Sequence, residues 1–118
     1  MRDRVGRPLD RPDPVSDTAL LYVTFASRAD AERVAETVLA DRLAACVNIL
    51  APCTSIYRWQ GGIERGEEVP ALFKTRPALA LRLRERIAAL HGYDLPVIEQ
   101  WPVEAGNAVA RWIADETR

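Results

Sequence analysis

The stretch 54–74, TSIYRWQGGIERGEEVPALFK, predicts a long β-hairpin. Residues 54–59 are rich in β-branched and aromatic side chains, which favour strands. The glycine pair at 61–62 predicts the turn, because glycine adopts positive φ without a steric penalty. Residues 63–74 predict the return strand. Two helices of the same chain cannot cover so long a ribbon, so we expect its exposed edges to pair with another chain.

The chain upstream of this hairpin predicts a strand, a helix and a second strand. Residues 20–25 (LLYVTF) form a compact β-branched and aromatic run, which is typical of a buried strand. Ser27 predicts the start of a helix whose apolar residues recur at steps of three and four as far as Leu43. Residues 45–50 (ACVNIL) predict the second strand, which bends at 51–52 because proline cannot donate a ladder hydrogen bond.

The chain downstream predicts a second helix, a further strand and a short last helix. Pro77 favours the first turn of the second helix, and His91 with the glycine after it predicts the end of that helix. The apolar residues at helical spacing between them are Leu79, Leu83, Ile87 and Leu90. Residues 96–103 predict a strand, which Pro102 restricts to a sheet edge or a strand end, and Asn107 predicts the cap of the last helix.

This order of elements, β-α-β-β-α-β followed by a helix, predicts an α+β fold of the ferredoxin-like class, with an extended β-hairpin and a short C-terminal helix. Such a fold is an antiparallel sheet with two helices on one face. The 118 residues suffice for one domain of ordinary size, which we expect to span 18–118. Residues 1–17 combine charged residues and prolines without an apolar stretch and predict a flexible tail.

Composition limits the classes of partner. The formal net charge is −1, which does not favour a nucleic acid or an acidic membrane surface. No apolar run approaches the roughly 20 residues that span a bilayer, and the N-terminus does not resemble a secretory signal. We therefore expect a cytoplasmic protein whose two cysteines are reduced.

Six segments resemble the CutA divalent-cation-tolerance family in their order and spacing. They are YVTFAS (22–27), RLAACVNIL (42–50), TSIYRWQGGIE (54–64), FKTRP (73–77), HGYDLPVI (91–98) and NAVARWI (107–113). The resemblance covers roughly residues 19–118, and several motifs agree together, so it is far more specific than one short pattern.

The resemblance implies a homotrimer in which the β-ribbons pair between subunits, in an architecture similar to the trimeric PII signalling proteins. It also implies a role in tolerance of divalent metals, copper above all, and it carries over no catalytic mechanism, so we do not expect an enzyme. Three positions depart from the family pattern. Gly92 follows the motif histidine where proline is frequent, Gln60 stands where glutamate is common, and Thr24 stands where some bacterial members have cysteine.

Cys46 and His91 are the candidate metal ligands, because copper prefers thiolate and imidazole and both residues match motif positions. Two plainer interpretations remain open: Cys46 as a small buried hydrophobe, and His91 as a helix end that bonds to the last carbonyls. Cys53 is expected to be a surface thiol without function. In a simple extended register the two cysteines, seven residues apart, point to opposite sheet faces. Copper or another divalent metal is the expected cofactor, and folding is not expected to require it.

A second candidate site is an intersubunit cleft. If the trimer brings the strands together, its lining is expected to include Tyr57, Trp59, Lys74, Tyr93 and Asp94. For Trp59 a subunit contact is the favoured role, since a lone domain would leave its large ring wet. For Lys74 a solvated strand end is the alternative.

Two other classes of protein, acylphosphatase-type enzymes and RNA-recognition modules, share this order of elements. The residues of this chain support neither class. An acylphosphatase would need a glycine-rich phosphate cradle after the first strand, where residues 25–28 contain no glycine. An RNA-recognition module would need a Gly-aromatic pattern that residues 69–74 lack. Two binding roles remain: a metal-binding trimer, or a PII-like scaffold that binds a small anionic effector or a partner protein. Metal binding that requires His91 would favour the first, and anion binding that requires Lys74 or Arg76 would favour the second.

Overall fold

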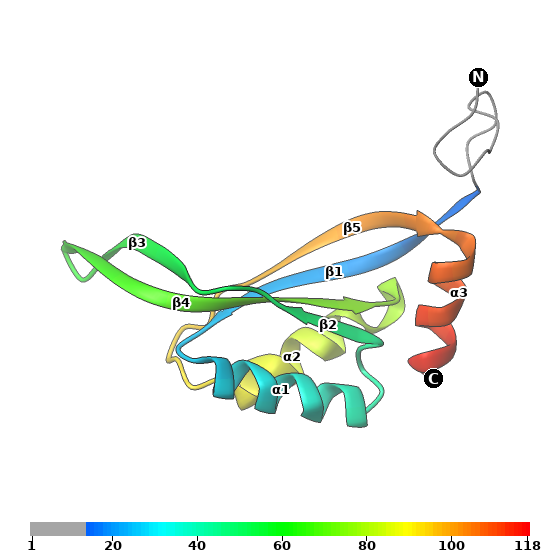
Figure 1. The fold of residues 1–118 in the computed structure, drawn as a ribbon, viewed down its shortest axis with the longest axis horizontal. Coiled ribbons are helices and arrows are strands. Elements are labelled where there is room, and N and C mark those ends of the chain that lie inside the picture. Colours follow the sequence, from blue (N-terminus) through cyan, green and yellow to red (C-terminus); the bar gives the residue numbers. More distant parts are fainter. Residues whose placement is uncertain (1–13) are drawn as a thin grey trace, which may run out of the picture.

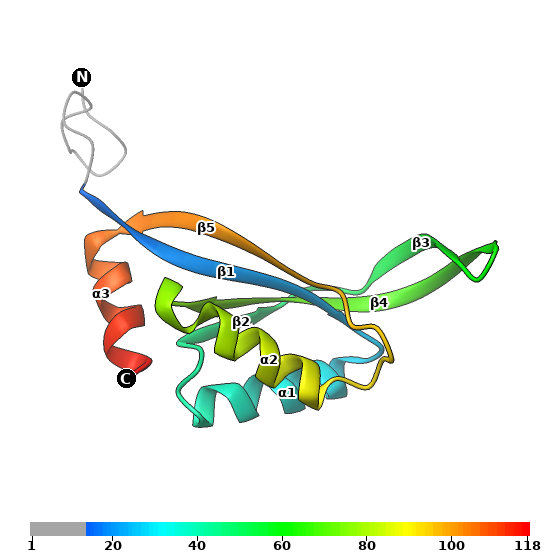
Figure 2. The same cartoon turned by 180° about the vertical axis from the view of Figure 1, so that it is seen from behind.

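An antiparallel sheet with two helices on one face forms the body of the chain in the computed structural model, which describes residues 14–118 (Figure 1). The elements are β1 (Val15–Phe25), α1 (Arg28–Ala40), β2 (Cys46–Ile49), β3 (Cys53–Trp59), β4 (Gly62–Thr75), a 3-10 turn (Pro77–Leu79), α2 (Ala80–Leu90), β5 (Ile98–Gly106) and α3 (Asn107–Glu116). The strand order is β2-β4-β1-β5, and β3 pairs with β4 beyond the end of β2. Both views show α1 and α2 beneath the sheet, and α3 at the end opposite the β3–β4 ribbon (Figures 1 and 2).

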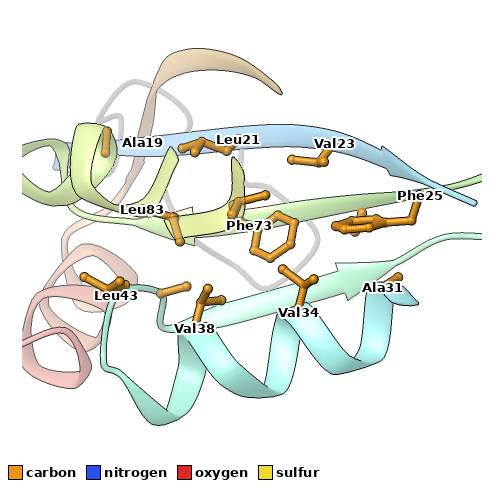
Figure 3. Close-up of a cluster of buried hydrophobic side chains, with 14 of the residues drawn as sticks. Ala19, Leu21, Val23, Phe25, Ala31, Val34, Val38, Leu43, Phe73 and Leu83 are labelled. Atoms are coloured by element: carbon orange, nitrogen blue, oxygen red, sulfur yellow. The ribbon is translucent and has the colours of Figure 1, made fainter. Parts of the chain in front are cut away.

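The hydrophobic core lies between the sheet and the two helices (Figure 3). Alternate residues of β1, among them Leu21, lie opposite alternate residues of β4, among them Phe73, on the helix-covered face. Val34 and Val38 of α1 and Leu83 of α2 pack against them, and all of these side chains are fully buried. Each such residue contributes about 1.5–3 kcal/mol of hydrophobic stabilisation. The apolar residues at strand spacing and those at helical spacing therefore pack into one core.

Both ends of α1 are set by local hydrogen bonds. The Asp30 N–H donates to Ser27 Oγ at 3.1 Å, which confirms the predicted N-cap. The helix ends at Ala40, three residues before the predicted end at Leu43. Arg42 has a φ of 59°, and the Leu43 N–H returns to the Val38 carbonyl at 3.0 Å. This Schellman-type ending still buries Leu43 in the core, which is why its periodicity resembled a continuing helix.

The hairpin turn lies one residue earlier than predicted. Gln60 and Gly61 have positive φ, of 49° and 83°, while Gly62 already pairs with Trp59. Two successive positive φ angles match the right-handed twist of the strands in a two-residue turn. Pro70 lies where β4 changes partner from β2 to β3, so its missing N–H removes no regular ladder bond.

The outer elements differ from the predictions at their ends. β1 begins at Val15, not at residue 20, because Ser16 and Asp17 pair with β5 although their polarity gives no strand signal. Residues 1–13 of the predicted tail, 1–17, lie outside the described residues. Residues 15–17 of that tail belong to β1. β5 begins at Ile98 and is an edge strand, as Pro102 predicts.

The predicted cap of the last helix is wrong. The N-cap of α3 is Gly106, without a side-chain hydrogen bond, whereas Asn107 Oδ1 accepts a 2.6 Å bond from Ser16 Oγ. The amide of Asn107 is therefore turned towards β1, and it does not fold back over its own helix. Within residues 14–118 no helix is long and apolar enough to cross a membrane.

Candidate functional site

Glu68 is the centre of a polar cluster at the base of the β3–β4 ribbon. Tyr93, in the loop after α2, donates from its hydroxyl to Glu68 Oε2 at 3.0 Å. Partial burial alone would raise the pKa of Glu68, but hydrogen bonds from Ser55, Tyr93 and Thr24 outweigh it and hold that pKa below its ordinary value. The cluster therefore presents a fixed carboxylate at neutral pH.

Tyr93 is kept protonated by the same contact. Burial, and next the hydrogen bond to Glu68, raise the pKa of Tyr93 from 10.0 to about 12. A phenol whose proton is shared with a carboxylate donates steadily over the whole physiological range of pH. Tyr93 is thus a positioning residue that holds the Glu68 carboxylate.

His91 supports this cluster from the core side. Its ring stacks on Phe25, with 4.7 Å between centroids, and lies equally close to the Tyr93 ring. His91 Nε2 is 2.7 Å from the Thr24 carbonyl oxygen, which can only accept, so Nε2 carries the proton. The Tyr93 N–H donates to Nδ1 at 3.1 Å, which makes the ring the neutral Nε2–H tautomer.

The backbone and the ring of His91 make different contacts. Its backbone N–H caps α2 by bonding to the Ile87 carbonyl at 2.9 Å, so the helix end is at the predicted place. The ring, however, does not bond to the last carbonyls of α2; it reaches Thr24 in β1 instead. Both ring nitrogens are used within the chain, so a metal would have to displace the Tyr93 N–H to reach Nδ1.

The two cysteines lie on one sheet face, which corrects the expectation of opposite faces. Cys46 pairs with Lys74 and Cys53 pairs with Glu68, six residues apart on β4. Ala51 and Pro52 insert one extra residue between the two registers, a β-bulge that restores the same parity. Six residues of strand span about 20 Å, so the two thiols cannot share a ligand within one chain. Both cysteines are free and half-buried.

Cys53 is the thiol that the fold brings to the Glu68 cluster. Its Sγ lies 3.9 Å from Ser55 Oγ, and Glu68 is its cross-strand partner. Burial first, and then the negative charges of Cys53 and Glu68, raise the pKa of Tyr22, so these groups lie close together. Sequence reasoning missed Glu68; the one available signal was a charged residue next to the apolar run 69–73.

The predicted cleft residues are divided between two parts of the chain. Tyr57 and Trp59 follow Cys53 and Ser55 at steps of two along β3, so they lie on the ribbon face that carries Cys53. Their side chains are 48% and 44% exposed, which leaves this face open to a partner. Tyr93 joins the same region through Glu68.

Lys74 and Asp94 do not join the ribbon cluster within one chain. Lys74 lies beside Cys46, six residues along β4 from Glu68, and Asp94 is exposed in the loop after Tyr93. Cys46 and His91 are likewise apart, because Lys74 pairs with Leu20 while His91 contacts Thr24, four residues further along β1. Across residues 14–118 no three His, Cys, Asp or Glu side chains converge as a metal site would require.

The fold and the cluster define a small α+β protein with a projecting two-stranded ribbon and a carboxylate–thiol pair at its base. The chain belongs to the CutA1 divalent ion tolerance protein family, whose sequence profile matches residues 19–116. The family resemblance stated from the sequence is thereby confirmed.

Relatives at high coverage support the assignment. The divalent-cation tolerance protein CutA of Pyrococcus horikoshii is 41% identical over 100 residues, which cover 84% of this chain and 97% of that protein. Human protein CutA is 34% identical, covering 95% of this chain and 68% of the human one. The crystal structure of CutA from Xylella fastidiosa superposes with a TM-score of 0.84 at 36% identity, over 87% of this chain and all of the other.

Proposed function

We propose that this chain is a ferredoxin-like subunit of a cytoplasmic homotrimer that acts in divalent-cation tolerance by binding the metal, copper among others, and not by catalysis. The divalent ion tolerance family supports the physiological role. The strand order, with two helices on one sheet face, supports the fold class. The observation that carries metal binding is the register pair of Cys53 with the ionised Glu68.

Exposed apolar surface on the ribbon supports assembly. Ile56 and Ile63 are 61% and 69% exposed on one face of the ribbon, and Trp59 is 44% exposed on the other face. In the described part of the chain, β3 pairs only with β4 and β5 pairs only with β1, so backbone donors and acceptors are open along both outer edges. Pairing with the ribbon of another copy would cover both the apolar side chains and the open edges.

The ligand chemistry at the ribbon base suits a divalent metal. Copper and zinc favour thiolate, and a carboxylate adds a negative oxygen. Two ligands do not close a tetrahedral site, so we propose that a neighbouring subunit completes it once the ribbons pair. Cys46 is less suited, because its cross-strand neighbour is the ammonium of Lys74, whose charge opposes a cation.

The proposal makes assembly the first step and metal binding the second. A cytoplasmic location is consistent with two free cysteines, since reducing compartments keep thiols available. His91 enters as a positioning residue: it packs Tyr93, and Tyr93 holds Glu68. Loss of His91 should weaken metal binding less than loss of a direct ligand.

Copper titration by calorimetry tests the proposal, with assembly of each variant followed by light scattering. Wild type should bind saturably, and Cys53→Ser and Glu68→Gln should each weaken binding by at least about tenfold while remaining trimeric. Cys46→Ser is the matched control and should bind as wild type does. If Cys46→Ser alone loses copper binding, the metal site lies beside Lys74 and not at the ribbon base. No saturable binding by the wild-type trimer would exclude direct metal binding.

A further inference from the structure

A second candidate site lies at the end of the sheet opposite the ribbon. The start of β1, the end of β4 and α3 lie together there (Figures 1 and 2). A cavity of about 340 Å³ is lined by residues of β1 and α3 and by Arg76, which follows β4. The polar residues that line it are Ser16, Asp17, Thr18, Arg76, Asn107 and Arg111. Asn107 and Arg111 are four residues apart on α3 and so share one helix face. This volume is at the small end of the range for ligand sites.

Arg76 has an unfulfilled hydrogen-bonding group beside this cavity. Its Nη2 donates to the Thr117 carbonyl at 3.1 Å, which fixes the side chain in place. Its Nε is buried and has no hydrogen-bond partner among residues 14–118. A buried donor without an acceptor is destabilising by about 1–3 kcal/mol, and most such groups in proteins are satisfied by protein, water or ligand. Because Nε itself is buried, a ligand in the cavity would meet only the part of Arg76 that lines it.

The cavity also carries an excess of positive charge. Four other arginines form ion pairs with a neighbouring carboxylate in the described part of the chain: Arg28, Arg33, Arg86 and Arg118. Neither Arg76 nor Arg111 has a carboxylate oxygen within ion-pair distance among those residues. Asp17 is the one acidic residue in the lining, against two guanidinium groups. A guanidinium presents paired donors that match the oxygens of a phosphate or a carboxylate.

The neutral groups of the lining add donors to the same space. Ser16 Oγ donates to Asn107 Oδ1 at 2.6 Å, which orients the amide and leaves its NH₂ group available as a donor. The first turn of α3 has neither a side-chain cap nor an acidic residue, so the positive end of its dipole remains at this wall.

We propose that this cavity binds a small oxyanion, a phosphate ester or a carboxylate, between Arg76 and Arg111. Asp17 disfavours a second anionic group at the rim, and it can accept a hydrogen bond from a ligand hydroxyl. The site therefore favours a ligand with one anionic group. All of the lining residues belong to one chain, and none of them belongs to the ribbon base, so the proposal does not require metal binding there. Lys74, which the sequence had grouped with Arg76 for an anionic effector, is not part of the lining.

Calorimetric titration of the metal-free protein tests this site, with inorganic phosphate and acetate as separate probes at constant ionic strength. Wild type should bind at least one probe saturably. Arg111→Gln should weaken that binding by at least about tenfold, because one of two guanidinium groups is lost. Arg84→Gln is the control: Arg84 is exposed on α2, and the variant changes the net charge equally. Arg76→Lys, checked for folding by circular dichroism, should also weaken binding, since a lysine keeps the charge but not the fork.

The two probes separate the ligand sources. Binding of phosphate alone indicates a phosphorylated ligand, binding of acetate alone indicates a carboxylate, and binding of both indicates recognition of the shared oxyanion. Two results overturn the proposal: neither probe saturates wild type, or Arg84→Gln weakens binding as much as Arg111→Gln does. Copper titration of Arg111→Gln should match wild type, which separates this site from the ribbon base.

Discussion

Tyr93 Oη donates a 3.0 Å hydrogen bond to Glu68 Oε2, and the two residues lie 25 positions apart in the chain. Tyr93 is in the loop that follows α2, whereas Glu68 is in β4, where the ribbon leaves the body of the sheet. The contact ties the loop to the base of the ribbon and orients the carboxylate. Because the bond is strongest between a protonated phenol and an ionised carboxylate, pH tests it from both sides.

Tyr93→Phe should reduce the loss of stability at alkaline pH. Burial, and then the bond to Glu68, raise the pKa of Tyr93 from 10.0 to about 12 in the folded chain. The stabilisation from this proton is complete below the unfolded pKa and is lost as the pH rises through the folded value. The free energy of unfolding, measured with urea between pH 10.0 and about 12, should fall more steeply for wild type than for the variant. Equal flattening in Tyr57→Phe would contradict the assignment to Tyr93.

Glu68→Gln should alter the acid side of the stability profile. The folded pKa of Glu68 lies below the ordinary value of 4.5, since its hydrogen bonds outweigh burial. Its contribution is therefore present above that ordinary value and is lost as the pH falls through the folded value. At neutral pH the variant should be less stable by about 1 kcal/mol, and it should lose less on acidification. Glu67→Gln, at an exposed neighbour, is the control and should follow wild type.

The hairpin turn can be located by alanine substitution. Gly61→Ala should destabilise the chain by about 1 kcal/mol, because Gly61 has a φ of 83°. Gly62→Ala should be nearly neutral, since its φ is ordinary and an added Cβ would meet only the Trp59 carbonyl oxygen at 3.9 Å. Thermal unfolding of both variants decides between the observed turn at 60–61 and the one expected at 61–62. A larger effect at Gly62 would place the turn where the sequence suggested.

Ile63→Glu should disrupt assembly without unfolding the subunit. The side chain is 69% exposed in the single chain, so a charge there disturbs no core packing, but it would be costly in an interface between ribbons. Light scattering should report a smaller mass for Ile63→Glu at the same concentration, with unchanged circular dichroism. Leu81→Glu, at a residue 54% exposed on α2, is the matched control and should assemble as wild type does. An intact trimer in Ile63→Glu would argue against ribbon pairing.

The elements that sequence reasoning located well are those with strong local signals. Ser27 caps α1 because its hydroxyl reaches an N–H three residues away, and such a bond needs no tertiary contact. Pro102 restricts β5 to an edge through its own missing N–H. The errors fell where tertiary pairing replaced a local preference: Asn107 bonds to Ser16 instead of capping α3, and Ser16 itself extends β1.

Family membership, the order of elements and the long ribbon follow from the sequence, because periodicity, turn residues and caps act over a few neighbouring positions. The tertiary structure alone decided which side chains meet. One extra residue at 51–52 places Cys53 on the face of Glu68, and the loop after α2 returns Tyr93 to the same carboxylate. Such contacts join positions far apart in the chain, and a pattern of near neighbours cannot specify the register that brings them together.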